Sequence, residues 1–538
     1  MSRLRGSAVV VERYAPAHPS PQPSPSRERG SDSGAARPPA HTEPVEVGAL
    51  WTPSRSMGDF PHPNPPPRGG RGSESEVGAA TETPAEVRER LRGLIRRLEA
   101  KPARSRRLEP GRAEVQSGAV ASEWRARPWG VEETFAVGSV SGGGREVSRR
   151  ETPSGGCWVI TERFPMDHFV GSQPLSDVAH VTPSTYSLLA PHEGVEDAAL
   201  GELVFLDIES SGLGGAGAMA FLVATGRFEG GPETQEFVLR QYLATSPPEE
   251  GGVLRALLDD HEVSAGDAVL VTYNGRTFDA PMLDGRATMH RQRAGFDALR
   301  HLDLLTPART AWRGALESCR LSMVETEILG LTRPAGEVSG GDVPGFYFRF
   351  LRSNDARLLA PIVEHNALDV VSLAAILARF SALMTGAREA SPMDAVALGR
   401  LHAARGLLDE GARHLAAALG LLPPSGVRDD VALRLASLHR KSGRRDLAVD
   451  LWREVAERPD GGIAPLVEIA KALEHDRRDY LGAIEVVEEA LRRAERLVRF
   501  DRGQANRWRE TLEHRRDRLL RRAERAASGV QRAAERVA

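Results

Sequence analysis

Two acidic residues interrupt a stretch of sequence that otherwise has the pattern of a buried β-strand. Residues 203–208 read Leu-Val-Phe-Leu-Asp-Ile, and Glu209 follows, so Asp207 and Glu209 are two positions apart. On a strand, residues at this spacing point to the same face of the sheet. Because burying a carboxylate is unfavourable unless a cation or hydrogen bonds compensate it, the fold must place such a partner beside this strand.

Two further apolar segments also lead to aspartates. Residues 268–272 have the composition of a short buried strand, and Asp279 follows after a loop. Residues 358–383 have helical periodicity and carry His365 and Asp369, which share one helix face because they are four positions apart. Divalent metal ions are the commonest compensation where several carboxylates converge. The three segments together therefore predict a two-metal site.

Each of these residues also has a simpler interpretation. Asp279 is placed to be the N-cap of the helix that follows it, a role compatible with metal binding. His365 fits either a core histidine with satisfied hydrogen bonds or a base beside a metal, and Asp369 fits an ion pair with an arginine. In the loop before Asp279, Asn274 and Arg276 are candidates for contacting a nucleic-acid backbone.

The order of the predicted elements indicates the fold class. Strands come first and helices are interleaved afterwards, a pattern typical of an α/β sheet covered on both faces. We therefore expect a mixed sheet flanked by helices over residues 200–388. The expected strands are 155–160, 203–208, 219–225, 235–243 and 268–272, and the expected helices are 253–258, 280–293, 321–329 and 358–383.

The 538 residues are too many for one hydrophobic core, so further domains are expected on both sides. Residues 1–82 are rich in Pro, Ser, Gly and Arg, which predicts a disordered extension; a Pro-rich ligand for a partner is the alternative. A start of translation at Met57 is also compatible with this composition. Residues 83–199 are expected to form a lead-in region that begins with a helix at 84–98.

From residue 394 onward the pattern is entirely helical. Ala412, Ala448 and Ala483 occupy matching positions in three similar segments and are 36 and 35 residues apart, close to the tetratricopeptide period of about 34. Residues 394–498 are therefore expected to form tetratricopeptide-like repeats, with a plain helical bundle as the alternative. Residues 499–538 are expected to form a basic helix that is either solvated or in contact with nucleic acid.

The overall composition limits the classes of protein to which this chain can belong. The net charge is −3, so overall charge does not indicate nucleic-acid binding. Cys157 and Cys319, the two cysteines, are far apart and in no zinc-binding spacing, and they give no support to a disulfide framework. No run of about 18 apolar residues predicts a membrane span, and the N-terminal apolar stretch is too short for a signal peptide. We therefore expect a cytoplasmic protein.

Six segments of the chain form a set that includes all of these acids. They are Phe205-Leu-Asp-Ile-Glu-Ser-Ser-Gly-Leu-Gly-Gly, Tyr273-Asn-Gly-Arg-Thr-Phe-Asp-Ala-Pro-Met-Leu, Asp303-Leu-Leu, Cys319-Arg-Leu-Ser, Asp342-Val-Pro-Gly345 and His365-Asn-Ala-Leu-Asp369. They resemble the exonuclease motifs of the DEDD superfamily, which has the ribonuclease H-like fold. Within it, the chain most resembles the bacterial YprB-like family, over about residues 155–385.

The resemblance implies a metal-dependent 3′–5′ exonuclease that hydrolyses phosphodiester bonds of DNA or RNA by a two-metal mechanism. It implies that His365 orients or deprotonates the attacking water. Single-stranded nucleic acid or a 3′ end is the expected substrate, and the helical repeats are expected to dock a protein such as a helicase, in DNA repair. The implied ligands of two Mg²⁺ or Mn²⁺ ions are Asp207, Glu209, Asp279 and Asp369.

Two departures from the family pattern concern the site. His365 precedes Asp369 by four residues, where the histidine branch usually has five, and this spacing is less suited to a general base. Ser210 and Ser211 stand where two threonines are common, which keeps both hydroxyls. Asp303, a fifth acid at an expected strand end, is expected to support the site without holding the metals.

Two other functions are compatible with the sequence. The first is a non-catalytic nucleic-acid- or protein-binding module that kept the fold, although the presence of all four acids argues against it. The second places the main functional surface on the helical array, with the α/β domain as its scaffold.

Overall fold

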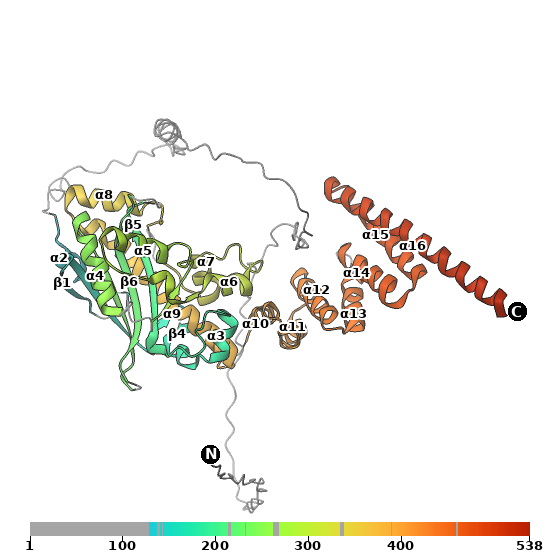
Figure 1. Cartoon of the computed structure of the whole chain (residues 1–538), viewed down its shortest axis with the longest axis horizontal. Helices are drawn as coiled ribbons and strands as arrows, with labels where there is room; N and C mark the ends of the chain where they lie inside the picture. The colour runs from blue at the N-terminus through green and yellow to red at the C-terminus, as the bar shows by residue number, and fades with distance from the viewer. Residues whose placement is uncertain are drawn as a thin grey trace, which may run out of the picture. The chain divides into compact units, whose positions relative to one another are not determined.

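A computed structural model describes residues 128–537 apart from 137–139, 143, 213–216, 232, 262–267, 334–337, 389 and 459–460. The expected N-terminal extension, the helix expected at 84–98 and the first part of the lead-in region lie outside these residues. The described chain comprises a mixed sheet flanked by helices, followed by a helical region (Figure 1). This is the predicted fold class.

The seven-stranded sheet has the order β1-β2-β7-β6-β5-β8-β9. Its first five strands are antiparallel to their neighbours, whereas β5, β8 and β9 run parallel. Every strand expected from the sequence is present. The strands are β1 (Glu146–Thr152), β2 (Gly155–Pro165), β5 (Leu203–Ser210), β6 (Ala220–Glu229), β7 (Glu236–Leu243), β8 (Val269–Thr272) and β9 (Arg300–Asp303), and a separate small sheet pairs β3 (Phe169–Val170) with β4 (Gln173–Pro174).

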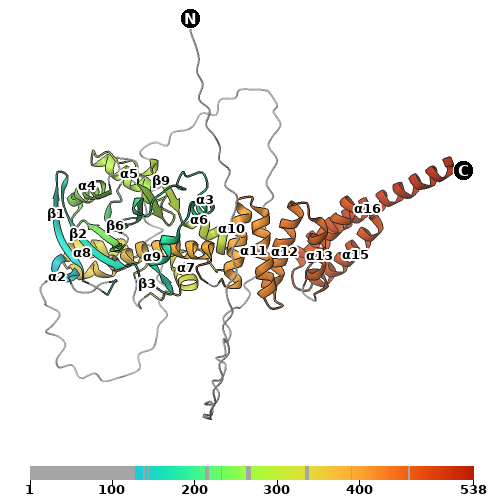
Figure 2. The ribbon, with the colours of Figure 1, turned by 90° about the horizontal axis from the view of Figure 1, so that it is seen from below.

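Helices cover both faces of the sheet, as the sequence predicted. Val204, Leu206 and Ile208 of β5 pack in one core with α4 (Glu250–His261) and α5 (Asp279–Met289). Leu203 and Phe205 pack in a second core with α6 (Leu305–Trp312) and α9 (Ala360–Thr385). Figure 2 shows α4 and α9 on opposite sides of β2 and β6. Alternate side chains of β5 therefore enter two different cores.

Shorter helices complete the α/β part of the chain. Helix α7 continues directly into a π-helical turn, and α8 precedes α9. The helices are α2 (Val131–Phe135), α3 (Pro183–Leu189), α7 (Leu321–Val324), the π-helical turn Glu325–Leu329 and α8 (Val343–Ser353), and the 3₁₀ turns are Leu175–His180, Leu200–Glu202, Pro247–Glu249, Phe296–Ala298 and Ala356–Leu358.

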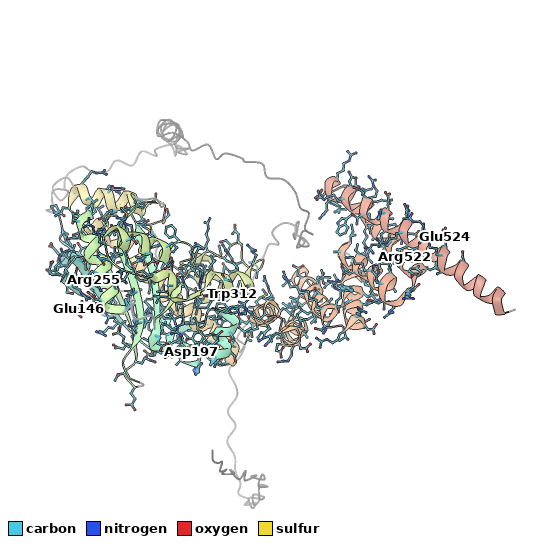
Figure 3. All side chains as sticks on the ribbon, in the orientation of Figure 1. Glu146, Asp197, Arg255, Trp312, Arg522 and Glu524 are labelled. Atoms are coloured by element: carbon cyan, nitrogen blue, oxygen red, sulfur yellow. The ribbon has the colours of Figure 1, made fainter. Side chains whose placement is uncertain are left out.

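Helix α9 is long and apolar enough to cross a membrane by length and composition alone. However, 78% of its most apolar window is buried inside the protein. Its C-terminal half packs against Trp312, the last residue of α6, which is labelled in Figure 3. The Trp312 ring stacks on the ring of Phe380, with centroids 4.9 Å apart. The apolar composition of α9 is therefore explained by its place in the core.

The C-terminal region is entirely helical, and each helix packs against the next. Ala412, Ala448 and Ala483 are buried near the start of the second helix of successive pairs, where their small side chains allow close approach. The tetratricopeptide type of these pairs stays a prediction. The helices are α10 (Pro392–Ala404), α11 (Leu408–Leu421), α12 (Gly426–Lys441), α13 (Arg445–Glu457), α14 (Ala464–Ala472) with a π-helical turn at Leu473–Arg477, α15 (Tyr480–Leu497) and α16 (Arg502–Val537).

Candidate active site

The alternation of β5 places its two acids on the face that α9 covers. Asp207 and Glu209 have the same parity as Leu203 and Phe205, which enter the core shared with α9. Asn366 of α9 confirms this orientation, because its Nδ2 donates to Asp207 Oδ2 at 2.7 Å. A bulge at the end of β5 shifts the register between Glu209 and Ser210, as is common beside functional sites.

A buried polar chain holds Asn366 in place. Gln241 of β7 donates from Nε2 to Asn366 Oδ1 at 3.0 Å and to the carbonyl of Val363 at 2.8 Å. Both amide side chains are fully buried. Neither residue was among the predicted site residues, although Asn366 lies inside the third segment. Its position directly after His365 was the signal that could have drawn attention to it.

Asp279 enters the site from the loop between β8 and α5. Gly275 has no side chain, and a Cβ there would lie 2.7 Å from Asp279 Oδ2 and 2.6 Å from Thr272 Oγ1. Asn274 adopts a left-handed conformation with φ 75°, and Asp303 Oδ1 accepts its backbone N–H at 2.8 Å. Asp303 thus shapes the loop that carries Asp279, in keeping with the supporting role expected for it.

The N-cap interpretation of Asp279 is wrong. Helix α5 begins at Asp279 itself, its N-cap residue is Phe278, and no side chain of the described residues makes a capping hydrogen bond there. An aspartate is favoured both at the cap and in the first turn, so the sequence alone does not separate these positions. The carboxylate is buried and faces the other acids instead.

The third segment reaches the same place from α9. His365 Nε2 lies 3.6 Å from Asp369 Oδ2, one helical turn away, and 3.9 Å from Glu209 Oε1 of β5. Helix α9 therefore brings a histidine and an aspartate to the end of the strand that carries the first two acids. All three acidic segments meet there.

Burial, and after it the mutual repulsion of the carboxylates, raises the pKa values of three of the acids. Burial, together with the charges of Asp369 and Asp279, raises the pKa of Glu209 to about 8. Burial and the charges of Asp303 and Asp369 raise the pKa of Asp279 to about 7. The pKa of Asp207 is also raised, chiefly by burial and then by the other three acids, against the hydrogen bond from Asn366. This part of the fold thus gathers carboxylates whose ionised forms are disfavoured.

One cation, which sequence reasoning missed, contacts this cluster. The guanidinium of Arg333 pairs with Asp369 and with the buried Glu325. Arg333 Nε lies 2.5 Å from Glu325 Oε2, and Arg333 Nη2 lies 2.6 Å from Glu325 Oε1. Its Nη1 also donates to His365 Nδ1 at 3.1 Å. Arg333 lies in a segment without periodic pattern and 36 positions from Asp369, so no local signal marks it.

The contact with Arg333 fixes the tautomer of a neutral His365. Because Nδ1 accepts from Arg333, the ring proton is on Nε2, the nitrogen that faces Glu209 and Asp369. In this arrangement His365 is a hydrogen-bond donor toward the acids. Asp369 is also paired with an arginine, which was the alternative interpretation of that residue.

The donor set fits hard divalent cations. Four carboxylates supply only oxygen ligands, which Mg²⁺ and Mn²⁺ prefer. The raised pKa values of Asp207, Glu209 and Asp279 mean that a cation between them would favour their ionised forms. Within the described part of the chain, no three His, Cys, Asp or Glu side chains already surround one metal position. Sharing a metal ion would therefore require the side chains of these acids to adjust.

The two residues expected to contact phosphates are engaged within the protein. Arg276 Nη2 lies 2.5 Å from Glu193 Oε2 and 3.2 Å from the carbonyl of His301. The side chain of Asn274 accepts a hydrogen bond from Thr277 Oγ1 at 3.2 Å. Their contact with nucleic acid stays a prediction, and for Arg276 it has to compete with the ion pair.

Comparison with known proteins agrees with the fold. Residues 204–381 match the RNase_H superfamily. Over 343 residues the chain is 29% identical to the uncharacterized protein YprB of Bacillus subtilis (strain 168), a match that covers 62% of this chain and 80% of that protein. The matched segment contains all four acids, His365 and the whole of β8 and β9, with most of β5 and α9. It is a ribonuclease H superfamily domain of the nuclease type, as the resemblance implied.

Proposed function

We propose that the ribonuclease H superfamily domain at residues 204–381 is a metal-dependent 3′–5′ exonuclease that releases nucleotides from single-stranded ends. The observation that carries the proposal is the convergence of Asp207, Glu209 and Asp279 beside Asp369, with pKa values raised by burial and mutual repulsion. If these acids had only a structural role, we would expect cationic side chains of the protein to neutralise them. Two Mg²⁺ or Mn²⁺ ions held by these four acids supply the missing charge.

The residues around the acids prepare them for this role. When bound, the metal ions lower the pKa of an attacking water and stabilise the charge on the leaving oxygen. Asn366 orients Asp207 by its hydrogen bond, and Asp303 holds the loop that carries Asp279. Such supporting contacts commonly fix the direction of metal-binding carboxylates.

His365 acts on water at its Nε2. While Arg333 donates to Nδ1, His365 carries a proton on Nε2 and orients the water as a hydrogen-bond donor. To accept a proton from water, it has to move the ring proton to Nδ1, which requires the Arg333 contact to break. Arg333 therefore controls whether His365 is a general base.

An exposed aromatic ring beside the acids supports a nucleic-acid substrate. Phe278, directly before Asp279, is 40% exposed although it is large and apolar. Bases stack on exposed aromatic side chains with little sequence preference, each stack contributing about 1–3 kcal/mol. In this proposal, the ring of Phe278 holds a terminal base next to the metal ligands.

A degradation assay tests the proposal. The full chain is incubated with 5′-labelled single-stranded DNA and RNA oligonucleotides in Mg²⁺, in Mn²⁺ and in chelator. We expect progressive shortening from the 3′ end in the presence of metal and none in chelator. Intact oligonucleotides in both metals, or equal degradation in chelator, contradict the proposal.

A non-catalytic binding module is the second candidate, and one observation favours it. Arg333 already neutralises Asp369, as a structural ion pair does. Oligonucleotide binding that is equal in metal and chelator, without any shortening of the strand, supports this candidate. The helical array as the main functional surface is tested by deleting residues 395–538 and measuring hydrolysis.

A further inference from the structure

A basic groove of about 430 Å³ lies between the nuclease domain and the helical region. It is lined by Arg309 of α6, Arg313 directly after α6, Arg400 of α10 and Arg434 of α12, together with Thr310 and Ser437. Helices α6 and α10 lie side by side in Figures 1 and 2 and pack against each other. Among the described residues, no carboxylate lines this arginine groove.

The side chains of the four groove arginines have no hydrogen-bond or ion-pair partner among the described residues, unlike several arginines nearby. Nearby arginines of the same helical region are paired: Arg428 lies 2.8 Å from Glu454, Arg444 2.5 Å from Asp409 and Arg458 2.5 Å from Asp429. Paired and unpaired arginines both occur in the described chain, and the groove is where four unpaired ones line a single surface.

The partial burial of two of these arginines makes the lack of a counter-charge unfavourable. Arg400 and Arg434 are half-buried, whereas Arg309 and Arg313 are exposed at the rim. Burial and the charge of Arg434 lower the pKa of Arg400 to about 10. The nearest acid on α12, Asp430, has a pKa that is raised by burial, against the charge of Arg434. A bound anion relieves this repulsion, and phosphate oxygens match the planar donor fork of arginine.

Helix α6 connects the groove to the loop of the candidate active site. Helix α6 begins two residues after Asp303, which holds Asn274. The neighbouring Tyr273 donates its hydroxyl proton to the carbonyl of Cys319 at 2.7 Å. Burial raises the pKa of the Cys319 thiol, and the charges of three groove arginines oppose that shift. Helix α6 and Cys319 thus link the loop beside the acids to the arginines.

Resting on the proposed nuclease function, we propose that the arginine groove binds backbone phosphates of the substrate strand upstream of the 3′ end held at the acids. A single strand is the ligand that presents phosphates at both places at once. Its phosphates ion-pair with the arginines without reading the bases, so the groove contributes affinity and not sequence preference. The helical region is then part of the substrate path.

Binding in chelator tests this proposal independently of hydrolysis. Fluorescence anisotropy measures the Kd of the full chain for a labelled single strand long enough to span both sites, over a salt series. We expect the double variant Arg400→Gln/Arg434→Gln to raise the Kd about tenfold or more. The slope of log K against log salt should fall by about 0.7 for each phosphate that the variant no longer binds.

Matched variants keep the result interpretable. Arg309→Gln/Arg313→Gln removes the exposed rim without touching buried positions and should also weaken binding. Arg453→Gln, on an exposed arginine of α13 outside the groove, should leave the Kd unchanged. Hydrolysis of a dinucleotide in Mg²⁺ should be the same in all variants, because the substrate is too short to reach the groove.

Three outcomes overturn the proposal. The first is an unchanged Kd and salt slope in both double variants. The second is competition by inorganic phosphate that displaces the strand at the groove as effectively as unlabelled oligonucleotide does, which indicates a small-anion site. The third is a loss of dinucleotide hydrolysis in the double variants that is as large as their loss of strand binding. If the wild-type chain hydrolyses nothing but binding still depends on the arginines, the groove stands and the nuclease proposal fails.

Discussion

Two sets of buried carboxylates in this chain differ in how they are neutralised. Glu250 is buried, which opposes its ionisation, but hydrogen bonds from Arg286, His290 and the backbone N–H of Ala220 lower its pKa. Glu474 is buried as well, and a hydrogen bond from Arg518 with other nearby positive charges lowers its pKa. Arg522, labelled in Figure 3, also lies 3.0 Å from Glu474.

The acids of the candidate active site show the opposite behaviour. The pKa values of Asp207, Glu209 and Asp279 are raised, because burial is reinforced by neighbouring negative charge. A chain that pairs Glu250 and Glu474 with arginines has the means to neutralise acids structurally. Where it does not, the missing charge points to a ligand. The arginine groove shows the same imbalance with the opposite sign.

The largest effect is expected from removing one acid of the unbalanced set. Asp207→Ala should abolish hydrolysis of a 3′ end in Mg²⁺, since a metal ligand is removed, while the fold remains because repulsion is relieved. Glu364→Gln is the control, because Glu364 is exposed on α9 next to His365. Rates are compared with thermal midpoints measured in chelator. Full activity of Asp207→Ala means that the assignment of the site is wrong.

A smaller loss is expected at the histidine. If His365 is the general base, His365→Ala should reduce kcat by roughly two to four orders of magnitude. A loss below about tenfold assigns it an orienting or structural role, since general-base removal usually has a larger effect. Whether His365 is a general base depends on its contact with Arg333. The pH–rate profile of Arg333→Gln should therefore be measured alongside that of the wild type. A profile that remains unchanged in that variant rules out control of His365 by Arg333.

Glutamine substitution should affect the two sets of acids in opposite directions. Glu250→Gln should lower the free energy of unfolding by about 1–3 kcal/mol, because it leaves the half-buried donors of Arg286 and His290 without a charged acceptor. Glu209→Gln should raise the unfolding free energy of the metal-free protein at pH 8. Denaturant unfolding in chelator measures both. Destabilisation by both substitutions removes the contrast on which the site assignment depends.

The last expected effect is a pH dependence of stability. Glu209 has a reference pKa of 4.5 and a folded-state pKa of about 8, so between these values the folded state holds more protons than the unfolded state. Stability of the metal-free protein should therefore fall as pH rises through this window. Mg²⁺ should raise the thermal midpoint more at pH 8 than at pH 6. A midpoint in chelator that rises from pH 6 to pH 8 contradicts this sign.

The sequence was most informative where one residue pattern determined both that a strand is buried and which face of the sheet its side chains point to. The apolar run of β5 placed Asp207 and Glu209 on one face, and the structure shows that face turned to α9. Strand β1 was missed because only Val147 of its seven residues is an aliphatic core type and its side chains are mostly exposed. An edge strand of this kind is determined by its pairing with β2, which no local pattern reports.

The contacts that complete the site depend on long-range packing. Gln241 reaches Asn366 across 125 positions, and Arg333 reaches Asp369 across 36. Neither pair has a helical or strand spacing, so only the folded chain brings the partners together. The cap interpretation of Asp279 was wrong for a related reason, since one position along the chain separates a cap from a first-turn residue.

Calorimetric titration of the metal-free chain with Mn²⁺ at pH 7 tests the central claim most directly. The account predicts two bound ions per chain and release of protons on binding, because the acids with raised pKa values have to ionise. Asp279→Asn should weaken binding and release fewer protons. Binding that is absent, or unchanged in both affinity and proton release in Asp279→Asn, contradicts the claim that these four acids form a metal site.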